Sequence, residues 1–213
     1  MELSPIQYFT ISIIPVLLAI TVHEAAHGYA AKHFGDKTAY FLGRITLNPI
    51  KHIDPVGTVV IPGMLLLLSA PFLFGWAKPV PVNFSNLNNP KKDMMWVALA
   101  GPASNLVMAI IWAITLGLFK SSGASYALFI IGMAQVGIMI NLVLMLLNLL
   151  PIPPLDGGRM AVSLLPAPWS YKLASIERYG MFILIFLIVS GLLSAILLPL
   201  LRFFQGTLIG IFV

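Results

Sequence analysis

The chain has 213 residues, of which 59% are hydrophobic and 9% are charged, and its formal net charge is +5. This composition excludes an ordinary soluble domain, in which about a quarter of the residues are charged. The positive charge does not indicate nucleic-acid binding, because the Lys and Arg residues lie between apolar runs and form no basic patch interleaved with polar aromatic residues. The absence of cysteine excludes disulfides, zinc knuckles and thiol catalysis. We therefore expect an integral membrane protein in contact with a lipid bilayer.

Apolar runs of about 20 residues, enough to cross a hydrocarbon core of ~30 Å, recur along the chain. They cover approximately residues 5–34, 56–75, 94–119, 126–150 and 178–201. Only short polar connections separate them, so the sequence predicts one integral-membrane domain over residues 1–213. The predicted fold class is an all-α polytopic membrane protein with about four full spans.

The polar connections are predicted to carry short β or extended elements on the cytoplasmic side. Residues 40–46 contain aromatic and β-branched side chains, which favour a short strand or hairpin before a turn at Asn48. In the next connection, Pro79 and Pro81 exclude a helix interior and favour an extended segment.

The run at 56–75 is predicted to enter the membrane and return. A full crossing would put the basic connections before and after it on opposite faces, although short cytoplasmic loops carry the excess of Lys and Arg. Its Pro62, Gly63 and Pro71 permit a broken or re-entrant segment where neighbouring protein covers the backbone. One face then holds Lys32, Lys37, Arg44, Lys51, Lys78, Lys91, Lys92, Arg159, Lys172 and Arg178, and the other holds Lys120 and Arg202. This threading puts the N-terminus outside and the basic connections in the cytoplasm.

The first apolar run contains the sequence HEAAH at residues 23–27. On a helix, His23 and His27 stand one turn apart on one face, so both imidazoles can bind a single tetrahedral zinc ion. Glu24 lies beside them and can act on a water molecule at the metal. Because such polar residues are costly in a membrane span unless they are partnered or functional, a metal site is favoured over helix capping or polar packing.

A catalytic zinc ion needs a third protein ligand. His33 has the spacing of the third histidine in metzincins, but Ala30 stands where those enzymes have glycine. A continuing helix carries His33 about 9 Å beyond His27. We therefore expect His33 to be an interfacial residue at the helix end.

Four other residues are candidates for the third ligand or for its support: Asp36, His52, Asp54 and Asp156. Asp36 and Asp54 adjoin turn-forming residues, and His52 and Asp54 are also candidates for groups that hold the metal ligands. Asp156 ends a connection that the charge pattern brings to the same face as HEAAH, and it has no obvious partner among its prolines and glycines. We expect Asp156 to be the third ligand of one zinc ion per chain.

Polar and small residues in the third and fourth runs are interpreted mainly as packing elements. Gly101 and Asn105 flank Pro102, and they favour close helix packing with an interhelical hydrogen bond over a direct catalytic part. Asn105 therefore stays a candidate for structural support of the site. Gln135 and Asn141 receive the same interpretation.

Three motifs resemble the site-2 protease family of intramembrane zinc metalloproteases. They are HEAAH at 23–27, AGPASN at 100–105 and NLLPIPPLDGG at 148–158, in the order and approximate spacing of that family. LNPIKHIDPVGT and GWAKPVPVN are similar to its compact branch, which lacks PDZ and CBS domains. The resemblance implies hydrolysis of peptide bonds within or near transmembrane segments of membrane-protein substrates, as in regulated intramembrane proteolysis, in a prokaryotic cell membrane.

The resemblance also implies roles for individual residues. His23, His27 and Asp156 correspond to zinc ligands, Glu24 to the catalytic acid/base, and Asn148 to a residue that binds or orients the substrate backbone. Two other functions stay open from the residues alone: a membrane zinc transporter, which needs further polar ligands across the bilayer, and a zinc-binding scaffold without activity.

Overall fold

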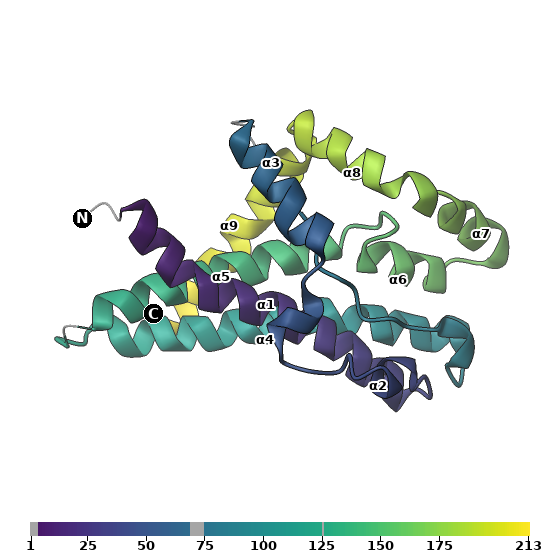
Figure 1. The fold of residues 1–213 in the computed structure, drawn as a ribbon, viewed down its shortest axis with the longest axis horizontal. Helices are drawn as coiled ribbons and strands as arrows, with labels where there is room; N and C mark the ends of the chain where they lie inside the picture. Colours follow the sequence, from purple (N-terminus) through teal and green to yellow (C-terminus); the bar gives the residue numbers. More distant parts are fainter. Residues whose placement is uncertain (1–3, 69–74, 125) are drawn as a thin grey trace.

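The computed structural model describes residues 4–68, 75–124 and 126–213. This part of the chain is mainly helical and contains no strand (Figure 1). The elements are α1 (Pro5–His33), α2 (Thr38–Phe41), η1 (Pro49–His52), η2 (Pro55–Val60), α3 (Ile61–Leu67), η3 (Phe84–Asn86), α4 (Pro90–Lys120), α5 (Ala127–Asn148), α6 (Asp156–Leu164), α7 (Ala167–Ser175), η4 (Glu177–Tyr179), α8 (Gly180–Val189) and α9 (Leu192–Phe212). Three of the η elements are 3₁₀ helices and η2 is a π-helix.

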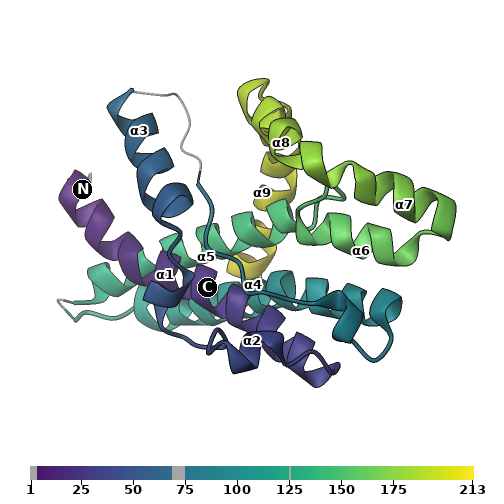
Figure 2. The same ribbon diagram turned by 45° about the vertical axis from the view of Figure 1, so that its right-hand side comes forward.

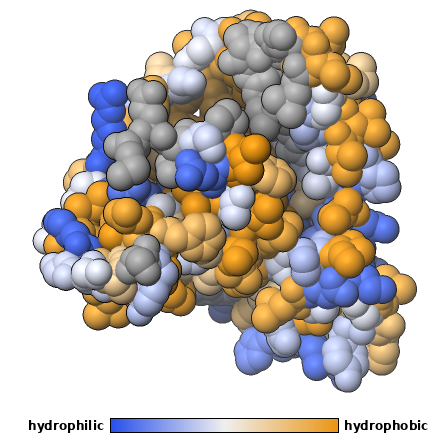
Figure 3. Space-filling model, turned by 60° about the vertical axis from the view of Figure 1, so that its left-hand side comes forward, coloured by the Kyte–Doolittle hydropathy of each residue, from blue (hydrophilic) through white to orange (hydrophobic). Residues whose placement is uncertain are grey.

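Four of the described helices are long and apolar enough to cross a membrane: α1, α4, α5 and α9. This confirms the prediction of an all-α fold with about four full spans. Large apolar side chains such as Ile6, Leu118 and Phe182 are exposed on the surface. Hydrophobic residues also cover much of the face in Figure 3. Such a surface suits lipid and would be unusual in water.

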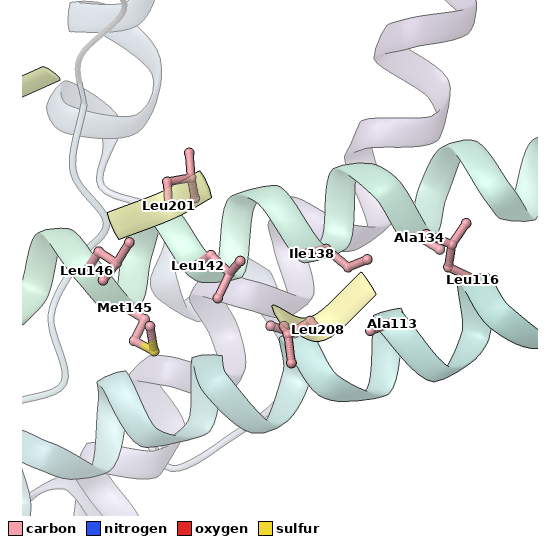
Figure 4. Close-up of a cluster of buried hydrophobic side chains, with 10 residues drawn as sticks. Ala113, Leu116, Ala134, Ile138, Leu142, Met145, Leu146, Leu201 and Leu208 are labelled. Atoms are coloured by element: carbon pink, nitrogen blue, oxygen red, sulfur yellow. The ribbon is translucent and has the colours of Figure 1, made fainter. Parts of the chain in front are cut away.

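The core lies where α4, α5 and α9 meet (Figure 4). Ala109 and Ala113 on α4 and Ala134 on α5 are completely buried, and their small side chains let the helix backbones approach closely. Larger buried residues such as Leu142 and Leu208 fill the space between them. Helix α1 packs along α4 and α5, so these three helices form the bundle that carries the candidate site.

The segment that begins at Pro55 turns back to the point where it started. Its described helical part, η2 and α3, is roughly 20 Å long at 1.5 Å per residue, too short to cross a membrane. On return, Trp76 N donates to Gly57 O at 3.1 Å and Lys78 N donates to His52 O at 2.9 Å. Figure 2 shows α3 standing apart from the bundle. The re-entrant prediction is confirmed, although Pro71 lies outside the described residues.

Two details of the prediction are wrong. Residues 40–46 form no strand, because Thr38 donates its amide and its hydroxyl to Asp36 and the helix α2 starts there. The run at 178–201 is not one helix either: α8 ends at Val189, and Gly191 adopts a left-handed conformation with φ 75°. The fourth membrane-spanning helix is therefore α9, which continues to Phe212.

The ends of the spanning helices meet as the charge pattern predicts for Lys32, Lys91 and Lys120, but Arg202, expected on the same face as Lys120, lies in the middle of α9. Asn88 N, just before α4, donates to Phe34 O, just after α1, at 2.8 Å. Lys91 Nζ donates to Leu165 O at 2.6 Å, which brings the end of α6 to the same place. At the opposite end of α4, Lys120 Nζ donates to Val213 O at 3.4 Å.

Candidate active site

Three side chains from two distant parts of the sequence converge beside the bundle. His23 and His27 lie one turn apart on α1, and their Nε2 atoms are 3.1 Å apart. Asp156, the first residue of α6, places Oδ2 at 3.3 Å from each of these nitrogens. Among the described residues, these three form the one group of His, Asp and Glu side chains with the spacing of a metal site.

These distances fit a tetrahedral zinc ion. Ligand atoms about 2.0–2.1 Å from such an ion lie roughly 3.3–3.4 Å from one another. The observed separations of 3.1, 3.3 and 3.3 Å match the edges of one face of that tetrahedron. With three protein ligands, a four-coordinate zinc ion would have one position for water or substrate, as catalytic zinc sites do.

Hydrogen bonds on the far side of each imidazole determine which nitrogen faces the group. His27 Nδ1 lies 2.7 Å from Val97 O, and because a carbonyl oxygen only accepts, this nitrogen carries the hydrogen. His23 Nδ1 lies 2.6 Å from Asn105 Oδ1 and likewise donates. Both Nε2 atoms therefore point lone pairs at Asp156 Oδ2, a buried oxygen without a hydrogen-bond partner among the described residues. A bound cation satisfies all three atoms at once.

Glycines allow the backbone to come close enough to form this group. A Cβ atom on Gly101 of α4 would overlap His27 Nε2 and His23 Cε1, so α4 can pass the imidazoles only with glycine there. Similarly, Cβ atoms on Gly157 and Gly158 would overlap the backbone of Leu149 and Pro153. The DGG sequence thus lets α6 begin against the loop that follows α5, with Asp156 turned toward the histidines.

Glu24 lies on α1 beside the histidines but belongs to a separate set of contacts. Its carboxylate oxygen Oε2 accepts a hydrogen bond from Val80 N at 2.7 Å. Val80 is buried and belongs to residues 75–83, which form neither helix nor strand. Arg44 fixes the same segment by donating to Lys78 O at 3.1 Å and Pro79 O at 3.2 Å.

Comparisons with known proteins identify the family. The model of peptidase family M50 matches residues 116–191, a region that includes α5 and Asp156. The chain is 40% identical to YwhC of Bacillus subtilis over 96% of this chain and 94% of that protein. It is 30% identical to Rip2 of Mycolicibacterium smegmatis over 89% of this chain and 72% of that protein. Both relatives carry the name "putative zinc metalloprotease".

The chain belongs to peptidase family M50, the site-2 protease family. It is a zinc metallopeptidase, and its four long apolar helices make it an integral membrane protein. No solved structure gives a significant match to the chain.

Three other predicted site residues of this M50 protein lie near the site or at the base of the re-entrant segment. Asn148 ends α5, where its Nδ2 donates to Leu144 O at 3.0 Å. His52 is buried at the base of the re-entrant segment, with Nε2 at 3.0 Å from Thr46 O. Asp54 caps η2 by accepting from Val56 N at 3.1 Å and Gly57 N at 2.7 Å. None of the hydrogen bonds in the described part of the chain joins these three residues to His23, His27 or Asp156.

His33 and Asp36 differ in how well the sequence anticipated them. Helix α1 continues unbroken to His33, which is exposed and contacts Phe34 edge to face at a ring-centroid distance of 5.0 Å. That outcome agrees with the expectation that an unbroken helix carries His33 away from His27 and the other ligands. Asp36 is more than a turn residue: it is completely buried and accepts from Thr38 N at 3.0 Å and Asn83 N at 2.7 Å.

Sequence reasoning missed the main-chain groups of the M50 site and the contact made by Gly101. The carbonyl of Val97 and the amide of Val80 are present at every residue, so no side-chain pattern could reveal them. Gly101 was interpreted as close helix packing, but what it approaches is the pair of imidazoles. Its position within the AGPASN motif, four residues before the buried Asn105, was the available signal.

Proposed function

We propose that His23, His27 and Asp156 hold the catalytic zinc ion, and that this single-domain protein cleaves peptide bonds within or near transmembrane segments of other membrane proteins. One observation carries the proposal. Two Nε2 lone pairs and an unpartnered carboxylate oxygen meet with the separations of three corners of a zinc tetrahedron, inside a helix bundle with an apolar surface. A structural role alone gives no reason to bring three such acceptors together.

The depth of the site supports an intramembrane substrate. His23 lies roughly 15 Å from the end of α1 at His33, measured along the helix axis at 1.5 Å per residue. The basic residue Lys32 marks that end as the aqueous boundary. A peptide bond that reaches the site is therefore drawn from a segment inside the apolar layer.

The proposed mechanism assigns a task to each side chain. Bound zinc supplies Lewis-acid chemistry, which polarises the peptide carbonyl and makes water a stronger acid. Glu24 takes a proton from the attacking water and returns it to the leaving amine. The bond from Val80 N to Oε2 holds the carboxylate in place, so Oε1 is the oxygen that exchanges the proton. Asn148 binds or orients the substrate backbone near the end of α5.

The chain also has to present an unwound substrate to these groups. A substrate helix hides its carbonyl groups in its own hydrogen bonds and must open locally before attack. Residues 75–83 line the approach to Glu24 without regular structure of their own. His52 O accepts from Lys78 N and Asp36 accepts from Asn83 N, so both residues support this segment directly. Asp54 supports it indirectly by capping Gly57 of η2, whose carbonyl accepts from Trp76 N.

The variant Glu24→Gln tests the catalytic assignment. Wild type and variant are co-expressed with single-span membrane proteins, and the cut sites are mapped by mass spectrometry. We expect the variant to lose cleavage by a factor of about 10²–10⁴ and to retain one zinc ion per chain. Cleavage by the variant at the wild-type rate, or cuts that fall only in water-exposed loops, would contradict the proposal. A protein that binds zinc but cuts none of these substrates would favour the inactive-scaffold alternative.

We place the active site toward the cytoplasmic side of a prokaryotic cell membrane. The excess of Lys and Arg at the end of α1 that lies nearer the site supports this orientation. Because the natural chain has no cysteine, single cysteines can report it directly. With a maleimide that does not cross membranes, Ser122→Cys should react in intact cells and Lys37→Cys only after lysis. The reverse pattern would overturn the orientation.

A further inference from the structure

We propose that Asn141 on α5 is a positioning residue of the metal site, acting on His23 through Asn105. The proposal rests on the assignment of His23 as a zinc ligand. Asn141 lies far along the sequence from the ligands, and its sequence context indicates only helix packing. In the structure it forms the inner end of a chain of hydrogen bonds that ends at the imidazole.

The chain of hydrogen bonds has one consistent direction. Asn141 Nδ2 donates to Gly137 O at 2.8 Å, so its Oδ1 is the atom turned toward Asn105. Asn105 Nδ2 donates to that Oδ1 at 2.9 Å and to Ala19 O at 3.2 Å. The remaining oxygen, Asn105 Oδ1, then faces His23 Nδ1 at 2.6 Å. Each amide thus fixes the orientation of the next.

Burial restricts the hydrogen bonds that the two amides can form. Asn105 and Asn141 are both completely buried, and water cannot replace a missing partner without entering the bundle. The two sides of the metal site therefore differ. His27 is oriented by the main-chain carbonyl of Val97, which no side-chain substitution removes, whereas His23 depends on the two amides.

The consequence for zinc follows from the histidine tautomer. If Asn141 no longer accepts a hydrogen bond, Asn105 Nδ2 keeps only its longer bond to Ala19 O at 3.2 Å. The amide is then held less firmly and turns over more easily, which presents Nδ2 to His23. Nδ1 must then accept, the hydrogen moves to Nε2, and the lone pair that faces the metal is lost. Loss of such supporting partners typically lowers metal affinity by about 10–100-fold.

The proposal is tested by measuring the zinc affinity of the purified protein in competition with a chelator. Asn141→Leu should bind zinc roughly 10–100-fold more weakly than wild type and change the visible spectrum of the cobalt-substituted protein. Asn141→Asp is the rescue variant. A carboxyl group that is protonated in this buried position can accept from Asn105 and donate to Gly137 O, so we expect zinc affinity within about threefold of wild type.

Leu142→Ala is the matched control for lost packing. Leu142 is completely buried next to Asn141 and packs in the α4–α5–α9 core. This variant should unfold at lower temperature but keep the zinc affinity and the cobalt spectrum. If Leu142→Ala lowered zinc affinity as much as Asn141→Leu, or if Asn141→Leu bound zinc like wild type, the proposal would be wrong.

A double variant tests whether Asn141 acts through Asn105. In an Asn105→Leu background, Asn141→Leu should cause no further loss of zinc affinity, because the connection is already broken. If the two substitutions lowered zinc affinity by independent factors that multiply, Asn141 would not act through Asn105. His23→Ala separates this proposal from the ligand assignment. If His23→Ala bound zinc like wild type, His23 would not be a ligand, and the proposed role of Asn141 would be wrong as well. If His23→Ala lost zinc affinity but Asn141→Leu kept it, only the proposed role of Asn141 would be wrong.

Discussion

The metal ligands and the acid/base of this M50 protein are held by two different regions. The histidines belong to the helix bundle, where buried Asn105 and the Val97 carbonyl fix their rings. Glu24 belongs to the same helix, yet its carboxylate is fixed from outside by Val80, in the irregular segment 75–83. Polar bonds to loops tie that segment down, and apolar contacts of Val80 and Val82 with the ends of α1 and α4 add to them.

This difference indicates that zinc binding and proton transfer can be separated by mutation. A change in the bundle should disturb the ligands and abolish both properties. A change in segment 75–83 or its anchors should leave zinc in place and slow the reaction. Each variant below is therefore judged on zinc content and on cleavage rate together.

The largest effect is expected for Gly101→Ala in the bundle. The added methyl group overlaps both imidazoles, and at least one must leave its position because the α4 backbone is packed on both sides. We expect zinc affinity to fall by more than about 100-fold and cleavage to be lost. Gly206→Ala is the control, since a Cβ atom there meets open space. Zinc stoichiometry after dialysis measures the effect, and a Gly101→Ala protein with normal zinc content would contradict the proposed geometry.

An intermediate effect is expected for Val80→Pro in the irregular segment. Proline has no amide hydrogen, so the bond to Glu24 Oε2 is lost. We expect kcat to fall roughly 10–100-fold through misplacement of the carboxylate, with zinc content unchanged. Val80→Ala keeps the amide and should lose at most a few-fold. Equal rates for the two variants would mean that the amide does not position Glu24.

The same contrast explains which parts of the site the sequence could predict. His23, Glu24 and His27 share one helical turn, so their geometry follows from helix periodicity alone. Asp156 is distant in sequence, and the distribution of Lys and Arg was needed to bring it to the same side. Among the supporting groups, Asn105 was a candidate from the sequence. The main-chain groups of Val80 and Val97 could not be predicted, because every residue has them.

The errors in the fold have a related cause. Tyr40 and Phe41 favour a strand by local propensity, but Asp36 binds Thr38 and imposes a helical turn. The apolar run at 178–201 contains no charged residue after Arg178, so the Ser190-Gly191 pair was not read as a break and the left-handed turn at Gly191 was missed. At residues 40–46 two hydrogen bonds to one buried carboxylate override a pattern that spans several residues, and at Gly191 one backbone conformation does so.

The smallest effect concerns Asp36, an anchor of segment 75–83 that lies beyond the end of α1. Burial alone would raise the pKa of its carboxyl group, but hydrogen bonds from Thr38, Asn83 and Asn86 outweigh burial and lower the pKa below 3.8. A lowered folded-state pKa adds stability above the unfolded value, and this stability disappears as the pH falls through the folded value.

Asp36→Asn should therefore be less stable than wild type by roughly 1–3 kcal/mol at pH 7, through loss of charged hydrogen bonds. The difference should stay constant down to about pH 5 and shrink as the pH falls further, because only the wild-type group is protonated. Thermal unfolding in detergent between pH 7 and pH 3 measures it. A difference that grew on acidification would mean that the carboxylate is not stabilised where it lies. Zinc content should not change, since Asp36 anchors the segment beside Glu24 and makes no contact with the bundle histidines in the described structure.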